Sequence, residues 1–231
     1  MSIFKRLIYL LAGTFVLSLG IVLTMKANIG YAPWDAFQKG LADTFGISIG
    51  TSSILVSVVV AVVVVILGEK LGFGTIFNIF AVGIYIDILY YLKWIPEMQS
   101  FLPGLFMLMV GLFLCAIGTY LYIASAFGAG PRDSLMVALE RKAKIPVGLS
   151  RGIIEVTVCI TGWLLGGPVG IGTLISALGI GVCLQIVFAI VRFEATTVEH
   201  ETLDQTWQHI KNLVNFHKFS DSKESSLQKG K

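Results

Sequence analysis

Six long apolar stretches dominate the chain, and short polar segments separate them. A helix needs about 20 predominantly apolar residues to cross the hydrocarbon core of a bilayer. Each stretch comes close to that length, so the pattern predicts membrane-spanning helices. The stretches run over residues 7–26, 50–68, 73–93, 103–126, 148–165 and 169–191.

The composition agrees with this pattern. The chain is 55% hydrophobic and only 13% charged, whereas soluble domains carry about 25% charged residues. We therefore expect an all-α polytopic protein of the lipid bilayer. Lys5 and Arg6 precede the first stretch, as in a signal peptide, but the stretch is long and no small-residue cleavage site follows. We expect it to be a retained helix.

The apolar stretches belong to an internal repeat. Residues 13–87 recur without a gap as residues 111–185, at a constant offset of 98. Glycines and a Pro-x-Asp sequence carry the match, so it reflects backbone shape more than apolar composition. Each copy holds three stretches, and an odd number makes the copies insert with opposite orientation. The sequence predicts two inverted repeats, residues 1–98 and 99–195.

Each repeat also contains a short polar segment after its first stretch, residues 33–45 and 131–144. Proline suits the first helical position, and an acid in the first turn can accept its free N–H groups. Pro33 and Asp35, with Pro131 and Asp133 in the second copy, therefore predict the caps of two short helices.

These two short helices cannot span a bilayer, and two arrangements are open. They either lie in the membrane interface as amphipathic linkers or enter the membrane as half-helices. Transporters with inverted repeats hold substrates and ions at half-helix ends. Irregular backbone at that depth requires burial or a water-filled cavity.

Basic residues are distributed unevenly over the two predicted membrane sides. One side holds Lys5, Arg6, Lys70, Arg132, Arg141, Lys142 and Lys144. The opposite side holds Lys26, Lys39 and Lys93. Cytoplasmic loops carry the excess of Lys and Arg, so we expect a multi-pass protein with both termini in the cytoplasm.

Three ionisable residues lie inside the apolar stretches, namely Asp87, Arg151 and Glu155. A charge at the bilayer centre costs a few kcal/mol, so such residues face the protein interior or the bilayer surface. Arg151 and Glu155 are four positions apart and can pair on one helix face. The alternatives are that Arg151 snorkels to the surface and that Asp87 lies in an aromatic belt.

The repeat brings further polar residues to these faces. The charged pair of the fifth stretch corresponds to Ser53 and Ser57 of the first copy. Asp87 corresponds to Gln185. Two-fold related faces would line one cavity, so we predict these residues to form or gate a path. Positions at which the copies differ are the better candidates for specific chemistry.

The sequence contains no motif that indicates an enzyme, a metal site or nucleic-acid binding. The chain has no Gly-x-Ser-x-Gly, His-Glu-x-x-His or P-loop sequence, so we expect no enzyme and no cofactor. Cys115, Cys159 and Cys183 lie in apolar stretches without a Cys-x-x-Cys neighbour, which indicates neither a metal site nor disulfides. Dispersed Lys and Arg residues give no footprint for nucleic acid.

The segment 196–231 differs from the rest and is predicted to be a cytoplasmic tail. Apolar residues at helical spacing within 200–219 indicate an amphipathic helix. They are Leu203, Trp207, Ile210 and Val214. The polar composition beyond it indicates disorder.

Several of these motifs resemble a known family. The run Asn28-Ile-Gly-Tyr-Ala-Pro-Trp-Asp35 is followed by Gly-Ile-Ser-Ile-Gly-Thr and Gly-Phe-Gly-Thr before the next two stretches. These motifs, with Gly-Pro-Arg-Asp at 130–133, resemble the YczE-like branch of the YczE/YyaS/YitT bacterial membrane proteins over about residues 5–195. The resemblance implies a small multi-pass protein of the bacterial plasma membrane, and it implies no substrate.

Two functions remain in competition. The duplication and the matched polar faces favour a transporter or exporter of a small-molecule substrate. The alternative is an accessory or regulatory subunit that docks to a partner complex through its tail helix. Because a three-plus-three unit is small, a homodimer is a further expectation.

Overall fold

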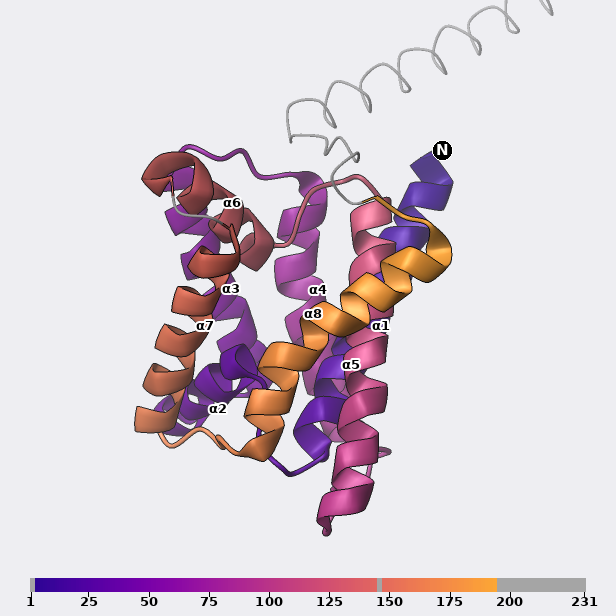
Figure 1. Cartoon of the computed structure of the whole chain (residues 1–231), viewed down its shortest axis with the longest axis vertical. Helices are drawn as coiled ribbons and strands as arrows, with labels where there is room; N and C mark the ends of the chain where they lie inside the picture. The colour runs from indigo at the N-terminus through magenta and orange to yellow at the C-terminus, as the bar shows by residue number, and fades with distance from the viewer. Residues whose placement is uncertain (1–2, 145–146, 195–231) are drawn as a thin grey trace, which may run out of the picture.

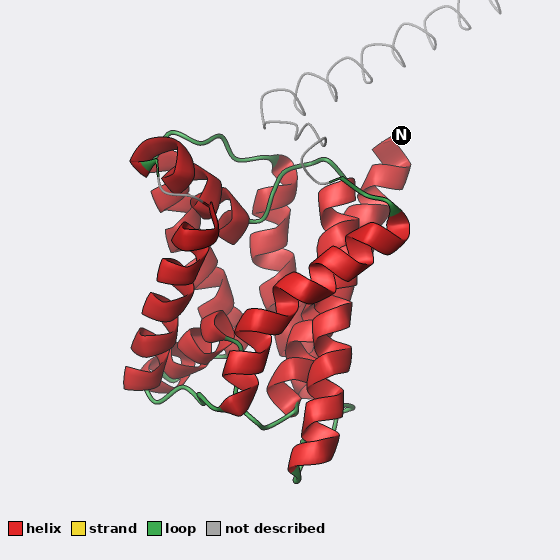
Figure 2. Cartoon of the chain, in the orientation of Figure 1, coloured by secondary structure: helices red, strands yellow, loops and turns green. Residues whose placement is uncertain are grey.

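The structure, a computed structural model, describes residues 3–144 and 147–194. In this part of the chain all regular structure is α-helical (Figures 1 and 2). The helices are α1 (Ile3–Lys26), α2 (Pro33–Phe45), α3 (Ile49–Ile66), α4 (Phe73–Leu92), α5 (Phe101–Ala124), α6 (Pro131–Ala143), α7 (Val147–Leu164) and α8 (Ile171–Val191). The predicted tail at 196–231 lies outside the described residues.

Each predicted apolar stretch forms one helix, and each short polar segment forms a helix of 13 residues. Five helices, α1, α3, α4, α5 and α8, are long and apolar enough to cross a membrane. The all-helical, polytopic architecture is thereby confirmed. The remaining stretch forms α7, which carries Arg151 and Glu155 and is not among these five, so the sixth span stays a prediction.

The distribution of polarity is the reverse of that in a soluble protein. Leu178 and Ile190 are 77% and 74% exposed, whereas Ser18 and Gln38 are fully buried. A soluble protein keeps most large aliphatic side chains inside and most polar side chains at its surface. An apolar exterior suits contact with lipid chains.

The helices form two groups. Figure 1 shows α2, α3, α6 and α7 on the left and α1, α4, α5 and α8 on the right. Within the second group, α1 packs along α5, α4 packs on α1, and α8 packs on α5. The groups meet mainly where α3 packs on α4, and α7 makes little contact with α8.

Glycines bring α1 and α5 into backbone contact. A Cβ atom on Gly20 would lie 2.7 Å from the carbonyl oxygen of Gly111. A Cβ atom on Gly13 would lie 3.0 Å from that of Gly118. Small residues permit this close packing of membrane helices. The earlier glycine of α1 meets the later glycine of α5, and the later glycine of α1 meets the earlier one of α5. The two helices are therefore antiparallel.

Loops of each repeat hold helix starts of the other. The N–H of Gly172 donates to the carbonyl of Ile29 at 2.7 Å, and the N–H of Gly74 donates to that of Phe127 at 2.8 Å. The donors are 98 positions apart in the sequence, and so are the acceptors. The same bond is therefore made in both directions between the halves.

The chain turns sharply between the first helix of each repeat and its short helix. Gly30 and Gly128 have φ angles of 113° and 138°, which L side chains rarely adopt. A Cβ atom on Gly30 would also lie 2.6 Å from the backbone nitrogen of Gly170. These turns direct Pro33 and Pro131, the first residues of α2 and α6, into the space between the two groups.

We predict that Gly20→Ala destabilises the protein, because its methyl group would meet the backbone of α5. Such overpacking costs about 1–3 kcal/mol. Gly181→Ala is the matched control, since nothing lies within 4 Å of its added Cβ and alanine favours the helix. Unfolding of the purified proteins in detergent measures both effects. Equal stability of the two variants would contradict the tight crossing of α1 and α5.

Candidate functional site

A cavity of about 200 Å³ lies between the two groups of helices, and every helix contributes to its lining. A water molecule occupies about 30 Å³ of liquid, so the volume accommodates roughly seven waters or one small organic solute. The first turns of α2 and α6 enter this space.

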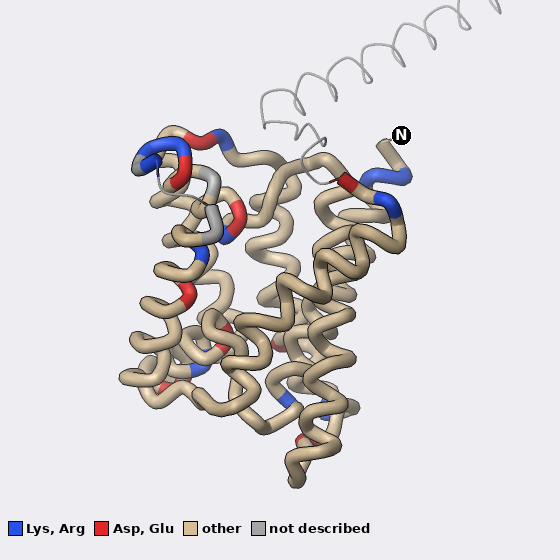
Figure 3. The backbone as a smooth tube through the Cα atoms, in the orientation of Figure 1, with Lys and Arg blue, Asp and Glu red and all other residues tan. Residues whose placement is uncertain are grey.

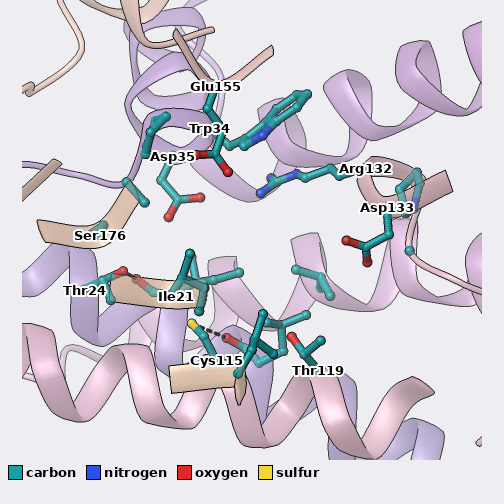
Figure 4. A pocket seen from close by; sticks show the side chains of 18 of the residues that line it. Ile21, Thr24, Trp34, Asp35, Cys115, Thr119, Arg132, Asp133, Glu155 and Ser176 are labelled. Carbon is teal, nitrogen blue, oxygen red and sulfur yellow. Dashed lines mark hydrogen bonds between the residues drawn. The ribbon is translucent and has the colours of Figure 1, made fainter. Parts of the chain in front are cut away.

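The contact between these first turns joins Trp34 and Arg132, which are 98 positions apart in the sequence. The Cζ atom of Arg132 lies 4.8 Å from the centroid of the Trp34 ring. Figure 4 shows the guanidinium reaching toward Trp34 and Asp35. A cation over an aromatic face is attracted by the quadrupole of the ring. The two short helices therefore contact each other through residues at equivalent positions of the two copies, one aromatic and the other cationic.

Apart from this contact with Trp34, the guanidinium of Arg132 is unpaired within the described residues. Within residues 3–144 and 147–194, its guanidinium makes neither a hydrogen bond nor an ion pair. A guanidinium carries five N–H donors, and a charge without hydrogen-bond partners is costly away from water. The arginine therefore presents open donor positions to the cavity.

Asp35 presents the opposite charge to the same cavity. Its side chain is 4% exposed, and its Oδ1 atom has no hydrogen-bond partner among the described residues. The sequence predicts that Asp35 accepts N–H groups at the start of α2, and no such bond is formed. The side chain faces the cavity instead.

A difference between the repeats explains this open carboxylate. The equivalent Asp133 accepts a hydrogen bond from the hydroxyl of Tyr122, and it too makes no bond to the start of its helix. Tyr122 corresponds to Thr24, whose shorter side chain donates to the carbonyl of Ile21 at 2.7 Å. Asp35 thus lacks the phenol that satisfies Asp133.

Neutral polar groups complete the lining. Ser53 and Ser57 lie on it, as does the matched pair Asn78 and Ser176. The Nδ2 atom of Asn78 and the Oγ atom of Ser176 are buried without a described partner. In the part of the chain that the structure describes, no group of three His, Cys, Asp or Glu residues could hold a metal ion.

The predicted charged pair of α7 also lies at the cavity. The Nε atom of Arg151 donates to Oε1 of Glu155 at 2.9 Å, as their spacing predicts. Both residues belong to the lining, and Figure 4 shows Glu155 in the same space as Trp34. Their charges are largely committed to each other.

Asp87 and Gln185 do not line the cavity. Asp87 accepts hydrogen bonds from the N–H of Gly50 at 2.8 Å and from the hydroxyl of Ser48, so it holds the start of α3 against α4. Gln185 is exposed. Because α8 makes little contact with α7, Gln185 has no corresponding helix start to bind.

Arg132 is a cavity residue that the sequence prediction missed. Its position in a polar segment counted it among the loop charges that orient the chain, whereas the structure places it on the cavity lining. A signal was present, because Arg132 corresponds to Trp34. It is therefore one of the positions at which the copies differ.

Comparisons with known proteins agree with the resemblance of the motifs. An uncharacterized protein of Haemophilus influenzae is 32% identical over 188 residues, which cover 81% of this chain and 85% of that protein. The uncharacterized membrane protein YczE of Bacillus subtilis is 30% identical over 182 residues, covering 78% and 84%. The uncharacterized protein YyaS of the same organism is 31% identical over 184 residues, covering 78% and 90%.

No solved structure matches the chain. The apolar helices and the similarity to a membrane protein establish an integral, multi-pass membrane protein. Residues 4–189 match the profile of a family of unknown function, DUF6198. The chain therefore belongs to this DUF6198 family, and its similarity to YczE and YyaS agrees with the resemblance of its motifs.

Proposed function

We propose that the protein is a transporter of a small solute, in which two inverted three-helix repeats surround the central cavity. The observation that carries this proposal is the cavity itself, where the first turns of α2 and α6 bring uncommitted charges between two groups of helices. Small-solute transporters place their binding sites at such repeat interfaces.

The reciprocal bonds between the halves support the inverted arrangement. Each repeat binds the other through equivalent atoms at Ile29 and Phe127, and α1 and α5 run antiparallel. The turn between α3 and α4 and the turn between α7 and α8 lie at opposite ends of the bundle (Figure 1). With α7 as a sixth span, the two repeats would cross the bilayer in opposite directions.

The packing of α2 and α6 supports half-helices that enter the membrane. Both helices pack on α3 and on α7, and Pro33–Asp35 are buried. An interfacial linker would instead expose one face along its whole length. Non-helical backbone before these helices is acceptable at membrane depth because it is enclosed by protein.

Movement of one helix group against the other would expose the cavity alternately to the two membrane sides. The cavity lies between the groups, and both contribute to its lining. Rocking of one bundle around a fixed site is a common mode of alternating access. The weak contact between α7 and α8 leaves this movement less obstructed on that side.

The charges support an orientation with the termini in the bacterial cytoplasm. Basic residues gather at the start of α1, in the turn between α3 and α4 and at the end of α6, all at the end of the bundle that holds the N-terminus (Figure 3). With Arg132 assigned to the cavity, the remaining basic residues still favour this end as the cytoplasmic side of the plasma membrane.

We predict opposite accessibility of the two turns. In a variant without its native cysteines, Val169→Cys should react with a membrane-impermeant maleimide added to intact cells. Lys70→Cys should react only after the membrane is permeabilised. Labelling of both positions from the same side would contradict the inverted repeats.

We predict that transport requires Arg132. Proteoliposomes with the wild-type protein should accumulate a solute from a cell extract, as measured by mass spectrometry against empty liposomes. Arg132→Gln should reduce this accumulation roughly tenfold or more, because it removes donors inside the cavity. Arg141→Gln, on the same helix but 69% exposed and paired with Glu69, should retain it. A wild-type protein that accumulates no solute would refute the transport function.

A further inference from the structure

Resting on the proposed transport function, we propose that the cavity binds a small zwitterionic solute. Its acidic group would accept hydrogen bonds from Arg132, and its ammonium group would donate to Asp35. Small amino acids are the chemical class that this arrangement fits.

The first support is the state of the two charges. Arg132 and Asp35 line one cavity and attract each other across it, yet they form no ion pair within the described part of the chain. Oxygen Oδ1 of Asp35 is buried and unpartnered. Two opposite charges that stay apart leave room for a ligand between them, with a negative group at one end and a positive group at the other.

The second support is that the other charges of the lining are engaged. Asp133 accepts from the hydroxyl of Tyr122, and Arg151 is paired with Glu155 at 2.9 Å. The charged groups of the lining that lack a described hydrogen-bond partner are one cation and one anion. A neutral ligand with separated charges matches both their signs and their number.

The third support comes from the divergence of the repeats. At the position of Arg132 the first copy has Trp34, and at the position of Tyr122 it has Thr24. The first difference creates a single cation, and the second leaves Asp35 without a donor. These two differences between the halves account for both ends of the site.

Simpler ligands fit less well. A monovalent anion would satisfy Arg132 and leave Asp35 uncompensated, and an amine would do the opposite. Leaving one charge of a buried set unpaired is strongly unfavourable. A zwitterion compensates both charges, and the free polar atoms of Asn78 and Ser176 can bind further groups of a solute that fits about 200 Å³.

Binding is tested on the full chain in lipid nanodiscs by the shift of its thermal unfolding midpoint. The probes are the common α-amino acids, β-alanine and taurine, with propionate and propylamine as single-charge controls. Bound ligand stabilises the folded state in proportion to the logarithm of its concentration over Kd. We expect at least one zwitterion to raise the midpoint at concentrations at which neither control does.

Two variants and two matched controls assign the site. Arg132→Gln and Asp35→Asn should each weaken zwitterion binding roughly 30-fold or more. Arg141→Gln on α6 and Asp43→Asn on α2 should retain binding, because these exposed residues are paired outside the cavity. Cooperative unfolding without ligand checks that each variant is folded before its binding is compared.

The remaining outcomes are also decisive. Stabilisation by no zwitterion, or by propionate with no effect of Asp35→Asn, would overturn the zwitterion site. Binding of an amino acid without flux in proteoliposomes would overturn transport and leave the site standing. Flux of a solute without separated charges would overturn the site and leave transport standing.

Discussion

The close crossing of α1 and α5 is the contact on which the rest of the structure depends. Their glycines place backbone against backbone, as Gly20 does with Gly111. Lipid chains are as apolar as leucine side chains, so the hydrophobic effect does not hold membrane helices together. Van der Waals packing and interhelical hydrogen bonds supply the attraction, and two backbones can approach this closely only where both helices carry small residues. The same crossing sets α1 antiparallel to α5, and the starts of α2 and α6, which follow these two helices in the chain, line the same cavity.

Matched and unmatched positions of the repeat have different roles. The matched glycines and the reciprocal bonds at Ile29 and Phe127 maintain the shared shape. The unmatched positions, Trp34 with Arg132 and Thr24 with Tyr122, determine the polarity of the cavity. A duplicated scaffold can conserve its packing while its centre becomes asymmetric, because the side chains that face the cavity are not required to hold the helices together.

The sequence predicts the helices well, because length and apolar character determine which segments can cross a bilayer. The pairing of Arg151 with Glu155 is also predictable, since both lie on one helix and their geometry is local. The side chain of Arg132 is not, because the depth of α6 is determined by its packing on α3 and α7. The outward position of Gln185 likewise depends on how far α8 lies from α7, which no local pattern reports.

The role of Asp87 has a consequence for how the two helix groups are connected. Its carboxylate binds the start of α3 through the N–H of Gly50, and the corresponding bond between α7 and α8 is missing from the described residues because Gln185 faces outward. The seam between the groups is therefore strong on one side only. If the two groups separate, they would pivot about the contact between α3 and α4. The gap would then open between α7 and α8, toward the surrounding lipid.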